Sequence, residues 1–206
     1  MKVIKPSFKI DEDDLDGEKM IRAIERRGRI CYKSEDRITP DSARAFIKAI
    51  IKRGHESVLE HEKISVIIIC DRGVTHEIVR HRIGDYSQES TRYCKYDDGI
   101  GVIDPFFFEN DEKKYEIWFR AMIACEKAYL GLLEAGASPQ EARSVLPNSL
   151  KTEIAVTYNL RQWRHFFKLR CAKAAHPQMR EITLPLLEEF KKLIPVVFED
   201  INPDEL

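Results

Sequence analysis

Residues 64–70, Ile-Ser-Val-Ile-Ile-Ile-Cys, decide the fold more clearly than any other stretch of the chain. β-Branched side chains occupy both sets of alternating positions, which is typical of a strand covered on both faces of a sheet. Asp71-Arg72-Gly73 predicts a turn after this strand, followed by a short amphipathic helix from Val74 to about Arg80. The stretch therefore indicates an α/β fold.

Two further strands are expected, near residues 88–96 and around residues 153–158. In the second, Ile154, Val156 and Tyr158 alternate with less apolar side chains. We therefore expect a small mixed or antiparallel sheet flanked by helices, in a single domain that spans residues 1–206. With 206 residues the chain has room for one substantial core or at most two small ones.

Apolar residues recur at helical spacing along much of the remaining chain. The longest such pattern predicts that Ile117, Met122, Cys125, Tyr129 and Leu132 point inward. Ser138-Pro139-Gln140-Glu141 forms a capping box with proline at the start of the next helix. The predicted helices cover residues 18–29, 39–54, 112–135, 138–146, 160–170 and 184–199.

The charge balance excludes whole-molecule attraction to nucleic acid or to an anionic membrane as the main driver of function. Lys and Arg number 34 against 35 Asp and Glu, so the formal net charge is -1 and any anion-binding site must be local. No apolar run resembles a signal peptide or a membrane span. The five cysteines are odd in number and form no CxxC pair, which favours reduced thiols in a cytoplasmic protein.

Several common site motifs are absent: the sequence contains no GxGxxG, GxxxxGK[ST], GxSxG or HExxH. His55-Glu56 and His61-Glu62 resemble metal ligands, but six residues between histidines do not place both on one helical face. A structural or hydrogen-bonding role is favoured for them, and no metal site is expected.

Residues 80–93 form the densest cluster of reactive groups. Arg80-His81-Arg82 would fan out around a helix end, because each helical step rotates by about a hundred degrees. Guanidinium groups bind phosphate oxygens in pairs, and Gln88, Ser90 and Arg92 alternate so that on a strand they would face one ligand. A solvated loop is the alternative, but the polar run favours recognition.

A second cluster covers residues 159–170. On a helical wheel Arg161, Arg164, His165 and Lys168 lie on one side, and Leu160, Trp163, Phe166 and Phe167 on the other. Arg170 falls inside the apolar stripe, where it needs an anionic partner. Both a buried carboxylate and a bound anionic ligand satisfy that need, and Arg143 raises the same question.

These clusters combine many arginines with few nucleophiles. Ser90 has no Ser-His-Asp context, and no cysteine lies in an activating motif. An organic cofactor would then carry the chemistry, with the protein supplying phosphate clamps and a cation where negative charge develops.

Arg80-His81-Arg82, seven residues and Ser90 together match the RHR-x7-S motif of the flavin-dependent thymidylate synthases, a family that this chain resembles. Residues 54–61 are similar to that family's GHExxxEH segment. Arg143, Leu146-Pro147 and residues 159–170 follow in the family's order, so the resemblance covers roughly residues 20 to 200.

The resemblance implies a cytoplasmic methyltransferase of nucleotide biosynthesis that converts dUMP to dTMP. It implies 5,10-methylenetetrahydrofolate as carbon donor, FAD as hydride carrier and NADPH as reductant, without a covalent enzyme nucleophile. It further implies a homotetramer with active sites between subunits, and neither a nucleic-acid nor a membrane partner.

The resemblance also implies site residues. Arg170 and Ser90 would be catalytic, Arg170 by favouring the uracil ring deprotonated at N3 and Ser90 by positioning dUMP. FAD would be held by Ser57, Arg80, His81, Arg82, Ile83, Gln88, Asn159, Leu160, Arg161 and His165. The residues around dUMP would be Glu77, Arg80, Gln88, Glu89, Ser90, Arg92, Arg143 and Arg170.

Two departures from the family pattern stand out. Many members have Glu where this chain has Gln88, and Glu89 lies next to it, so either residue could meet the ligands. Pro177, in the segment 176–182, is expected to alter the local backbone.

Two other functions fit the sequence. In a nucleic-acid-binding module, the Arg161-Arg164-Lys168 face would contact phosphates while Tyr86, Tyr93 or Trp163 stacks on bases. The other alternative is a protein that binds flavin or nucleotide without catalysing a reaction, and Gln88 is the only residue that favours it.

Overall fold

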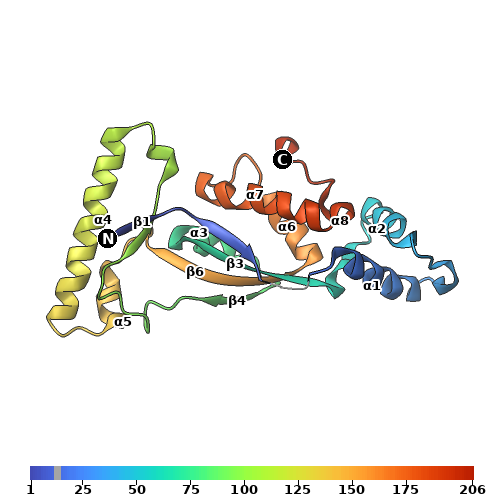
Figure 1. The fold of residues 1–206 in the computed structure, drawn as a ribbon, viewed down its shortest axis with the longest axis horizontal. Coiled ribbons are helices and arrows are strands. Elements are labelled where there is room, and N and C mark those ends of the chain that lie inside the picture. Colours follow the sequence, from blue (N-terminus) through green and yellow to red (C-terminus); the bar gives the residue numbers. More distant parts are fainter. Residues whose placement is uncertain (12–14) are drawn as a thin grey trace. The chain divides into compact units, whose positions relative to one another are not determined.

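The computed structural model describes residues 1–11 and 15–206 and has a mixed α/β fold (Figure 1). It contains two compact units, each assembled from separate stretches of the chain. The first unit comprises Met1–Lys9, Ile67–Arg82 and Tyr86–Val156, and the second comprises Ile10–Val66, Ile83–Asp85 and Thr157–Leu206. The α/β class is confirmed, and one domain over the whole chain stays a prediction.

The strands form two small sheets. The larger has the order β2-β3-β6-β4, with β2 at Ser7–Ile10, β3 at Lys63–Asp71, β4 at Asp85–Gln88 and β6 at Lys151–Asn159. In the smaller, β1 (Lys2–Ile4) pairs in parallel with β5 (Gly101–Ile103). The strands predicted around residues 64–70 and 153–158 are thus present as β3 and β6.

Strand β3 is buried on one face and half-buried on the other. Ile64, Val66, Ile68 and Cys70 are at most 1 % exposed, whereas the alternate side chains, including Ile67, keep part of their surface. The expectation of a strand covered on both faces was therefore wrong. β-Branched residues favour a strand but do not determine what covers each of its faces.

Strand β4 ends at Gln88, so the predicted strand over residues 88–96 was wrong beyond its first residue. The amides of Tyr93 and Cys94 donate to the carbonyl of Ser90 over 3.2 and 2.9 Å. The amide of Arg92 donates to Ser90 Oγ over 3.3 Å. These local bonds turn the chain, and Gln88, Ser90 and Arg92 therefore do not alternate along one strand.

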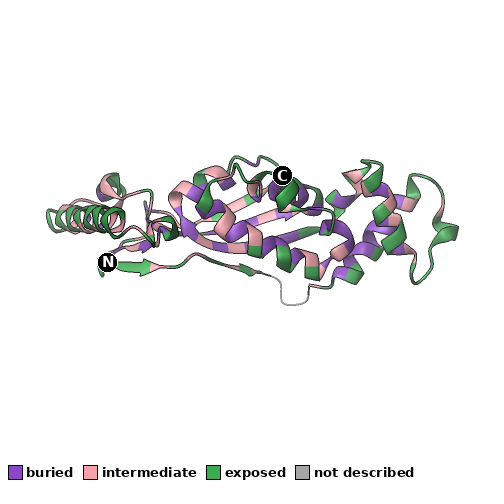
Figure 2. Ribbon diagram, turned by 90° about the horizontal axis from the view of Figure 1, so that it is seen from above, coloured by how far each residue is buried: buried purple, intermediate pink, exposed green. Residues whose placement is uncertain are grey.

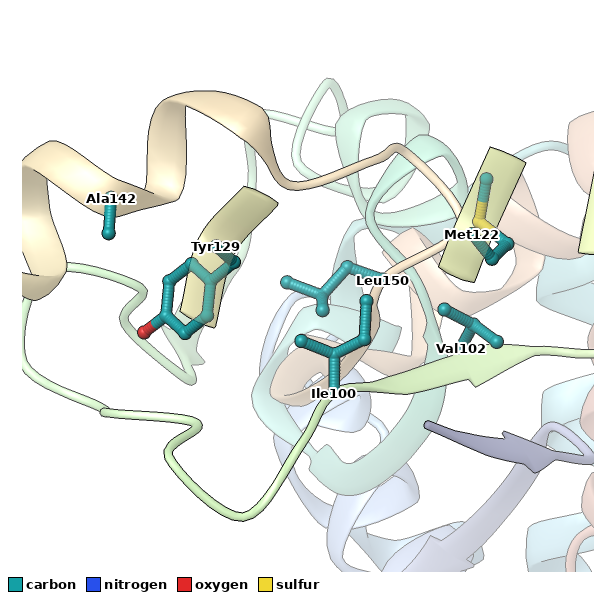
Figure 3. Close-up of a cluster of buried hydrophobic side chains, with 6 residues drawn as sticks. All are labelled: Ile100, Val102, Met122, Tyr129, Ala142 and Leu150. Atoms are coloured by element: carbon teal, nitrogen blue, oxygen red, sulfur yellow. The ribbon is translucent and has the colours of Figure 1, made fainter. Parts of the chain in front are cut away.

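The first unit contains α3 (Arg72–Ile78), η3 (Phe106–Phe108), α4 (Glu112–Glu134), α5 (Pro139–Ala142) and η4 (Arg143–Val145). Its core includes the buried cluster drawn in Figure 3, to which α4 contributes Met122 and Tyr129. The rest of α4 is half-buried or exposed (Figure 2), and Ile117 is 62 % exposed, so its predicted inward position was wrong. The capping box at Ser138 is confirmed.

The second unit contains α1 (Gly17–Ile30), η1 (Glu35–Arg37), α2 (Ser42–Lys52), η2 (Glu56–His61), α6 (Leu160–Arg170), α7 (Pro177–Leu193), α8 (Pro195–Phe198) and η5 (Pro203–Glu205). Aromatic rings from α6, α7 and α8 fill its core. Trp163 lies 4.9 Å from Phe190 between ring centroids, and Phe190 lies 5.2 Å from Phe198 at 87°. This packing orients α6.

The helix predicted over residues 184–199 is instead α7 followed by α8. Helix α7 begins at Pro177, where the missing N–H group is harmless, and Pro195 begins α8. Pro177 therefore starts a helix, which accounts for its effect on the backbone. No helix in the described part of the chain is long and apolar enough to span a membrane.

Candidate functional site

Two cavities in the second unit collect residues from distant parts of the sequence. The α6 cavity, of about 450 Å³, is lined by Glu56, Glu60, Ile83, Asn159, Arg161, Gln162, Arg164, His165 and Lys168. The α2 cavity, of about 380 Å³, is lined by Gly28, Cys31, Tyr32, Phe46, Ile50, Gly54, His55, Glu56, Ser57, Val58 and Arg161. Glu56 and Arg161 line both. Five residues predicted to bind the cofactor line these cavities: Ser57, Ile83, Asn159, Arg161 and His165.

The junction of β6 and α6 positions the polar residues of the α6 cavity. Asn159 caps the helix by accepting a hydrogen bond from the amide of Gln162 over 2.8 Å. Arg161 Nη1 lies 2.6 Å from Glu60 Oε1, an ion pair in which both side chains are about half exposed. Leu160 is fully buried, and its amide donates to the carbonyl of Glu62, so its side chain packs the core and lines neither cavity.

Arg164 is the buried guanidinium of α6, with a side chain only 1 % exposed. Its Nη1 and Nη2 atoms lie 2.6 and 2.7 Å from the two carboxylate oxygens of Asp200, and Nη2 lies 3.2 Å from Glu56 Oε1. Burial alone would raise the pKa of Asp200, but the hydrogen bond and charge of Arg164 hold it below its usual range. The wheel assignment of Arg164 to an exposed polar side was wrong.

The burial of Arg164 also removes support from the nucleic-acid-binding alternative. That alternative needs an exposed face of Arg161, Arg164 and Lys168, and Arg164 is enclosed by its carboxylate partners. Trp163 is fully buried and donates through Nε1 to the carbonyl of Ile64 over 2.9 Å, so it offers no surface to a base.

Arg170 is the last residue of α6 and is half-buried, so its predicted burial inside the apolar stripe was wrong. Its carbonyl accepts a hydrogen bond from Thr183 Oγ1 over 2.9 Å. Phe167 and Cys171, on either side of Arg170 along the chain, are fully buried, so Arg170 lies at the edge of the apolar stripe with part of its surface exposed. The catalytic role of Arg170 stays a prediction.

In the first unit, the Arg80-His81-Arg82 segment follows the end of α3 at Ile78. His81 is 5 % exposed, whereas Arg80 and Arg82 are exposed, so the histidine side chain is covered and the two arginine side chains reach solvent. The Tyr86 hydroxyl donates to the carbonyls of His81 and Ile78, which fixes the backbone between them.

Four arginines of the first unit that are predicted to bind ligands have exposed side chains: Arg80, Arg82, Arg92 and Arg143. Within residues 1–11 and 15–206, none of these four forms an ion pair. The guanidinium of Arg92 lies 5.4 Å from the centroid of the Tyr93 ring. A free, exposed guanidinium can bind a phosphate without first losing a carboxylate partner.

The two residues before Ser90 are held by contacts within the first unit. Gln88 Nε2 donates to Thr75 Oγ1 on α3 over 3.0 Å and to Thr152 Oγ1 on β6 over 3.2 Å. Glu89 Oε1 accepts a hydrogen bond from the hydroxyl of Tyr96. Both residues line a hollow of about 340 Å³, and Glu77 lies half-buried on α3.

Several lining residues were not predicted. Glu56, Glu60, Gln162 and Lys168 line the α6 cavity. Lys168 follows Arg161 by seven residues on one helix face, a spacing that could have identified it, but nothing in the sequence places Glu60 beside α6. The hydrogen-bonding role predicted for His55 is confirmed, because its Nδ1 lies 3.1 Å from the Tyr32 hydroxyl. Among the described residues no three His, Cys, Asp or Glu side chains form a metal cluster.

Comparison with known proteins gives matches over most of the chain. A protein-family model described as "Thymidylate synthase complementing protein" matches residues 16–196. A flavin-dependent thymidylate synthase from Geobacter sulfurreducens is 36 % identical over 189 residues, covering 88 % of this chain and 82 % of the relative. One from Pyrococcus abyssi is 37 % identical over 164 residues, covering 78 % and 67 %.

Among solved structures, a UMP/dUMP methylase, PolB from Streptomyces cacaoi bound with 5-Br dUMP, has the same fold. The TM-score is 0.80 at 22 % identity, and the match covers 97 % of this chain and 96 % of that one. The family match spans the cavities of the second unit and the exposed arginines of the first. The chain therefore belongs to the thymidylate synthase complementing protein family, whose relatives named above are flavin-dependent thymidylate synthases.

Proposed function

We propose that this protein is a flavin-dependent thymidylate synthase that methylates dUMP to dTMP. The carbon donor is 5,10-methylenetetrahydrofolate, the reductant is NADPH, and no enzyme nucleophile bonds to the uracil ring. The names of the relatives support the flavin and the reaction, and the solved methylase with a bromo-dUMP ligand supports the substrate.

The observation that carries the proposal is the convergence of Ser57, Ile83, Asn159, Arg161 and His165 on the α6 and α2 cavities. The lining fits a flavin dinucleotide, because it combines hydroxyl, amide and cationic donors for phosphate and ribose with apolar surface from Ile83, Phe46 and Val58. Bound there, FAD would supply hydride transfer. Arg161 would exchange its exposed ion pair with Glu60 for a phosphate contact, at little cost. Arg80, His81, Arg82 and Gln88 complete the proposed cofactor set.

The nucleotide is proposed to bind through the exposed arginines of the first unit. The guanidinium groups of Arg80, Arg92 and Arg143 form no ion pair within the described residues, and each can donate paired N–H hydrogen bonds to the phosphate of dUMP. Ser90 positions the nucleotide without attacking it, and Glu77 and Gln88 contribute polar contacts. Arg170 stabilises negative charge on the uracil ring when N3 is deprotonated, and exclusion of water would strengthen that interaction.

We further propose a cytoplasmic homotetramer in which each active site takes residues from more than one copy. Two impaired variants test this directly: Arg143→Ala, with weakened dUMP binding, and Arg170→Ala, with slowed turnover, are purified separately, mixed under conditions that allow subunits to exchange, and assayed at a dUMP concentration too low to saturate Arg143→Ala. If separate copies supply the two arginines to one site, mixing restores part of the dTMP formation. If one copy supplies both, mixing restores none.

The reaction itself is tested by a single-turnover assay for dTMP, with and without added FAD. The purified protein should be yellow, and dUMP should perturb the flavin absorbance. A colourless protein that takes up no FAD and binds RNA with a steep salt dependence would contradict the proposal.

A further inference from the structure

Glu89, Tyr96 and Lys151 form a side-chain cluster, and the contacts among the three are not explained by the cofactor residues or by the place of Glu89 among the residues expected around dUMP. The Tyr96 hydroxyl donates to Glu89 Oε1 over 2.6 Å, and Lys151 Nζ lies 2.8 Å from Glu89 Oε2. Both carboxylate oxygens are therefore engaged within the chain. Only 18 % of the Glu89 side chain and 24 % of the Lys151 side chain are exposed, so these charge-assisted bonds are partly shielded from water.

The environment keeps Tyr96 in the form that donates this bond. Burial raises the pKa of the Tyr96 phenol, and the hydrogen bond and charge of Glu89 raise it further. The hydroxyl therefore stays protonated throughout the physiological pH range. We call the contacts among Glu89, Tyr96 and Lys151 the clasp.

The clasp joins the two ends of one short segment, and both ends are anchored. At one end, the Glu89 amide donates to the carbonyl of Glu153 on β6 over 2.9 Å. At the other end, the Tyr96 amide donates to the hydroxyl of Tyr129 over 3.3 Å, and Tyr129 is fully buried in the core of the first unit. The clasp thus closes residues 90–95 into a loop between a strand and a core residue.

This loop carries Ser90 and Arg92. Its turn is formed by the amides of Arg92, Tyr93 and Cys94, which all bond to Ser90. Fixing such a loop before binding lowers the conformational entropy that a ligand must remove when it engages both side chains. An unclasped loop would sample other shapes and would bind the same ligand more weakly.

We propose that Glu89 is a positioning residue, whose clasp with Tyr96 and Lys151 holds residues 90–95 in the shape that presents Ser90 and Arg92 to dUMP. Its carboxylate does not contact the nucleotide, in contrast to the role that the family resemblance implies for it. The inference rests on the proposed function, in which Ser90 and Arg92 bind dUMP.

The first test measures dUMP affinity by titration calorimetry and steady-state kinetics in Glu89→Ala, Glu89→Gln, Tyr96→Phe and the Glu89→Ala/Tyr96→Phe double variant. Each of Glu89→Ala and Tyr96→Phe should weaken dUMP binding about tenfold, the scale of a lost hydrogen bond to a charged group. KM should rise while kcat changes little. The double variant should bind dUMP about as tightly as the single variant with the lower affinity, because both substitutions open the same clasp.

Two further variants separate positioning from other roles. Glu89→Gln keeps a carbonyl acceptor for the Tyr96 hydroxyl and should recover most of the affinity. Glu153→Gln removes a carboxylate that lies 3.8 Å from Lys151 Nζ but outside the clasp, and it should leave the affinity unchanged. Additive losses in the double variant, or unchanged affinity in Tyr96→Phe, would overturn the inference. Tyr96→Phe removes one oxygen atom, so the test survives if Glu89→Ala fails to fold.

A second measurement does not depend on the proposed function. Hydrogen exchange of the backbone amides of residues 90–96, without ligand, should be faster in Glu89→Ala and Tyr96→Phe than in the wild type or Glu153→Gln. Unchanged exchange would overturn the clasp, whatever the protein binds. If exchange is faster in the two variants but the wild-type protein does not bind dUMP, the clasp stands, and the proposed function and the ligand assigned to the loop are overturned.

Discussion

Arg164 and Arg143 carry the same side chain in opposite environments. Arg164 is buried in the second unit, with Asp200 and Glu56 engaging its guanidinium. Arg143 is exposed in the first unit and forms no ion pair within the described part of the chain. The difference shows that a buried arginine with carboxylate partners has a structural role, whereas an exposed arginine without an ion pair is available to an anionic ligand.

Replacing Arg164 should produce the largest effect in this comparison. Arg164→Met leaves Glu56 and Asp200 without their partner, and we expect the free energy of unfolding to fall by about 2–3 kcal/mol, below the loss for a fully buried pair because Asp200 is 45 % exposed. Urea unfolding monitored by circular dichroism measures it. Arg161→Met, which breaks an exposed pair, is the matched control and should cost less than about 1 kcal/mol. Equal losses in both variants would contradict the distinction.

Replacing Arg170 should come next, with its effect measured on the reaction. Arg170→Ala is expected to slow dTMP formation by about a hundredfold or more, the scale of a removed charge-stabilising donor, while FAD stays bound. A single-turnover assay together with the flavin absorbance spectrum measures both. Wild-type turnover in this variant would show that the assigned role is wrong.

Replacing Arg143 should have a smaller effect, confined to the nucleotide. Arg143→Ala is expected to weaken dUMP binding about tenfold by removing one charge-assisted contact with phosphate. Arg143→Lys should recover only part of the loss, because an ammonium group lacks the paired donors of guanidinium. Titration with dUMP and with uncharged deoxyuridine separates the phosphate contact from other contacts. An equal loss for both ligands would argue against phosphate binding.

The smallest predicted effect is on the pH dependence of stability. Arg164 lowers the pKa of Asp200 in the folded state below the pKa of about 3.8 that the group has in the unfolded chain. The ion pair therefore stabilises the folded state fully at pH values above 3.8, and this stabilisation is lost as the pH falls through the lower pKa of the folded state. Asp200→Asn should therefore be less stable than the wild type at neutral pH, with a difference that narrows below about pH 4. A difference that widens on acidification would contradict this assignment.

Much of the fold could be predicted because its signals are local. The periodicity of residues 18–29 and 160–170 identified α1 and α6, and the capping box at Ser138 identified the start of α5. The spacing between Arg80 and Ser90 indicated the family, and the match over residues 16–196 confirms it.

Most of the remaining incorrect predictions depend on contacts between distant segments, whereas the strand expected over residues 88–96 fails through local hydrogen bonds to Ser90. A helical wheel gives the direction of Arg164 but does not show that Asp200, 36 residues later, covers it. In the same way, the apolar pattern around Ile117 does not show that only part of α4 is covered. Likewise, the sequence near Arg143 does not show whether a carboxylate from another segment pairs with its guanidinium. Local patterns therefore predicted the candidate residues, while pairing and burial decided which of them are available to a ligand.

The most direct test measures two quantities on the same two variants: the free energy of unfolding and the affinity for dUMP, for Arg164→Met and Arg143→Ala. We predict that Arg164→Met loses stability and keeps most of its dUMP affinity where it is folded, whereas Arg143→Ala loses affinity and unfolds like the wild type. The reverse pattern, or two variants that lose both quantities alike, would contradict the assignment of paired arginines to the fold and free arginines to the nucleotide.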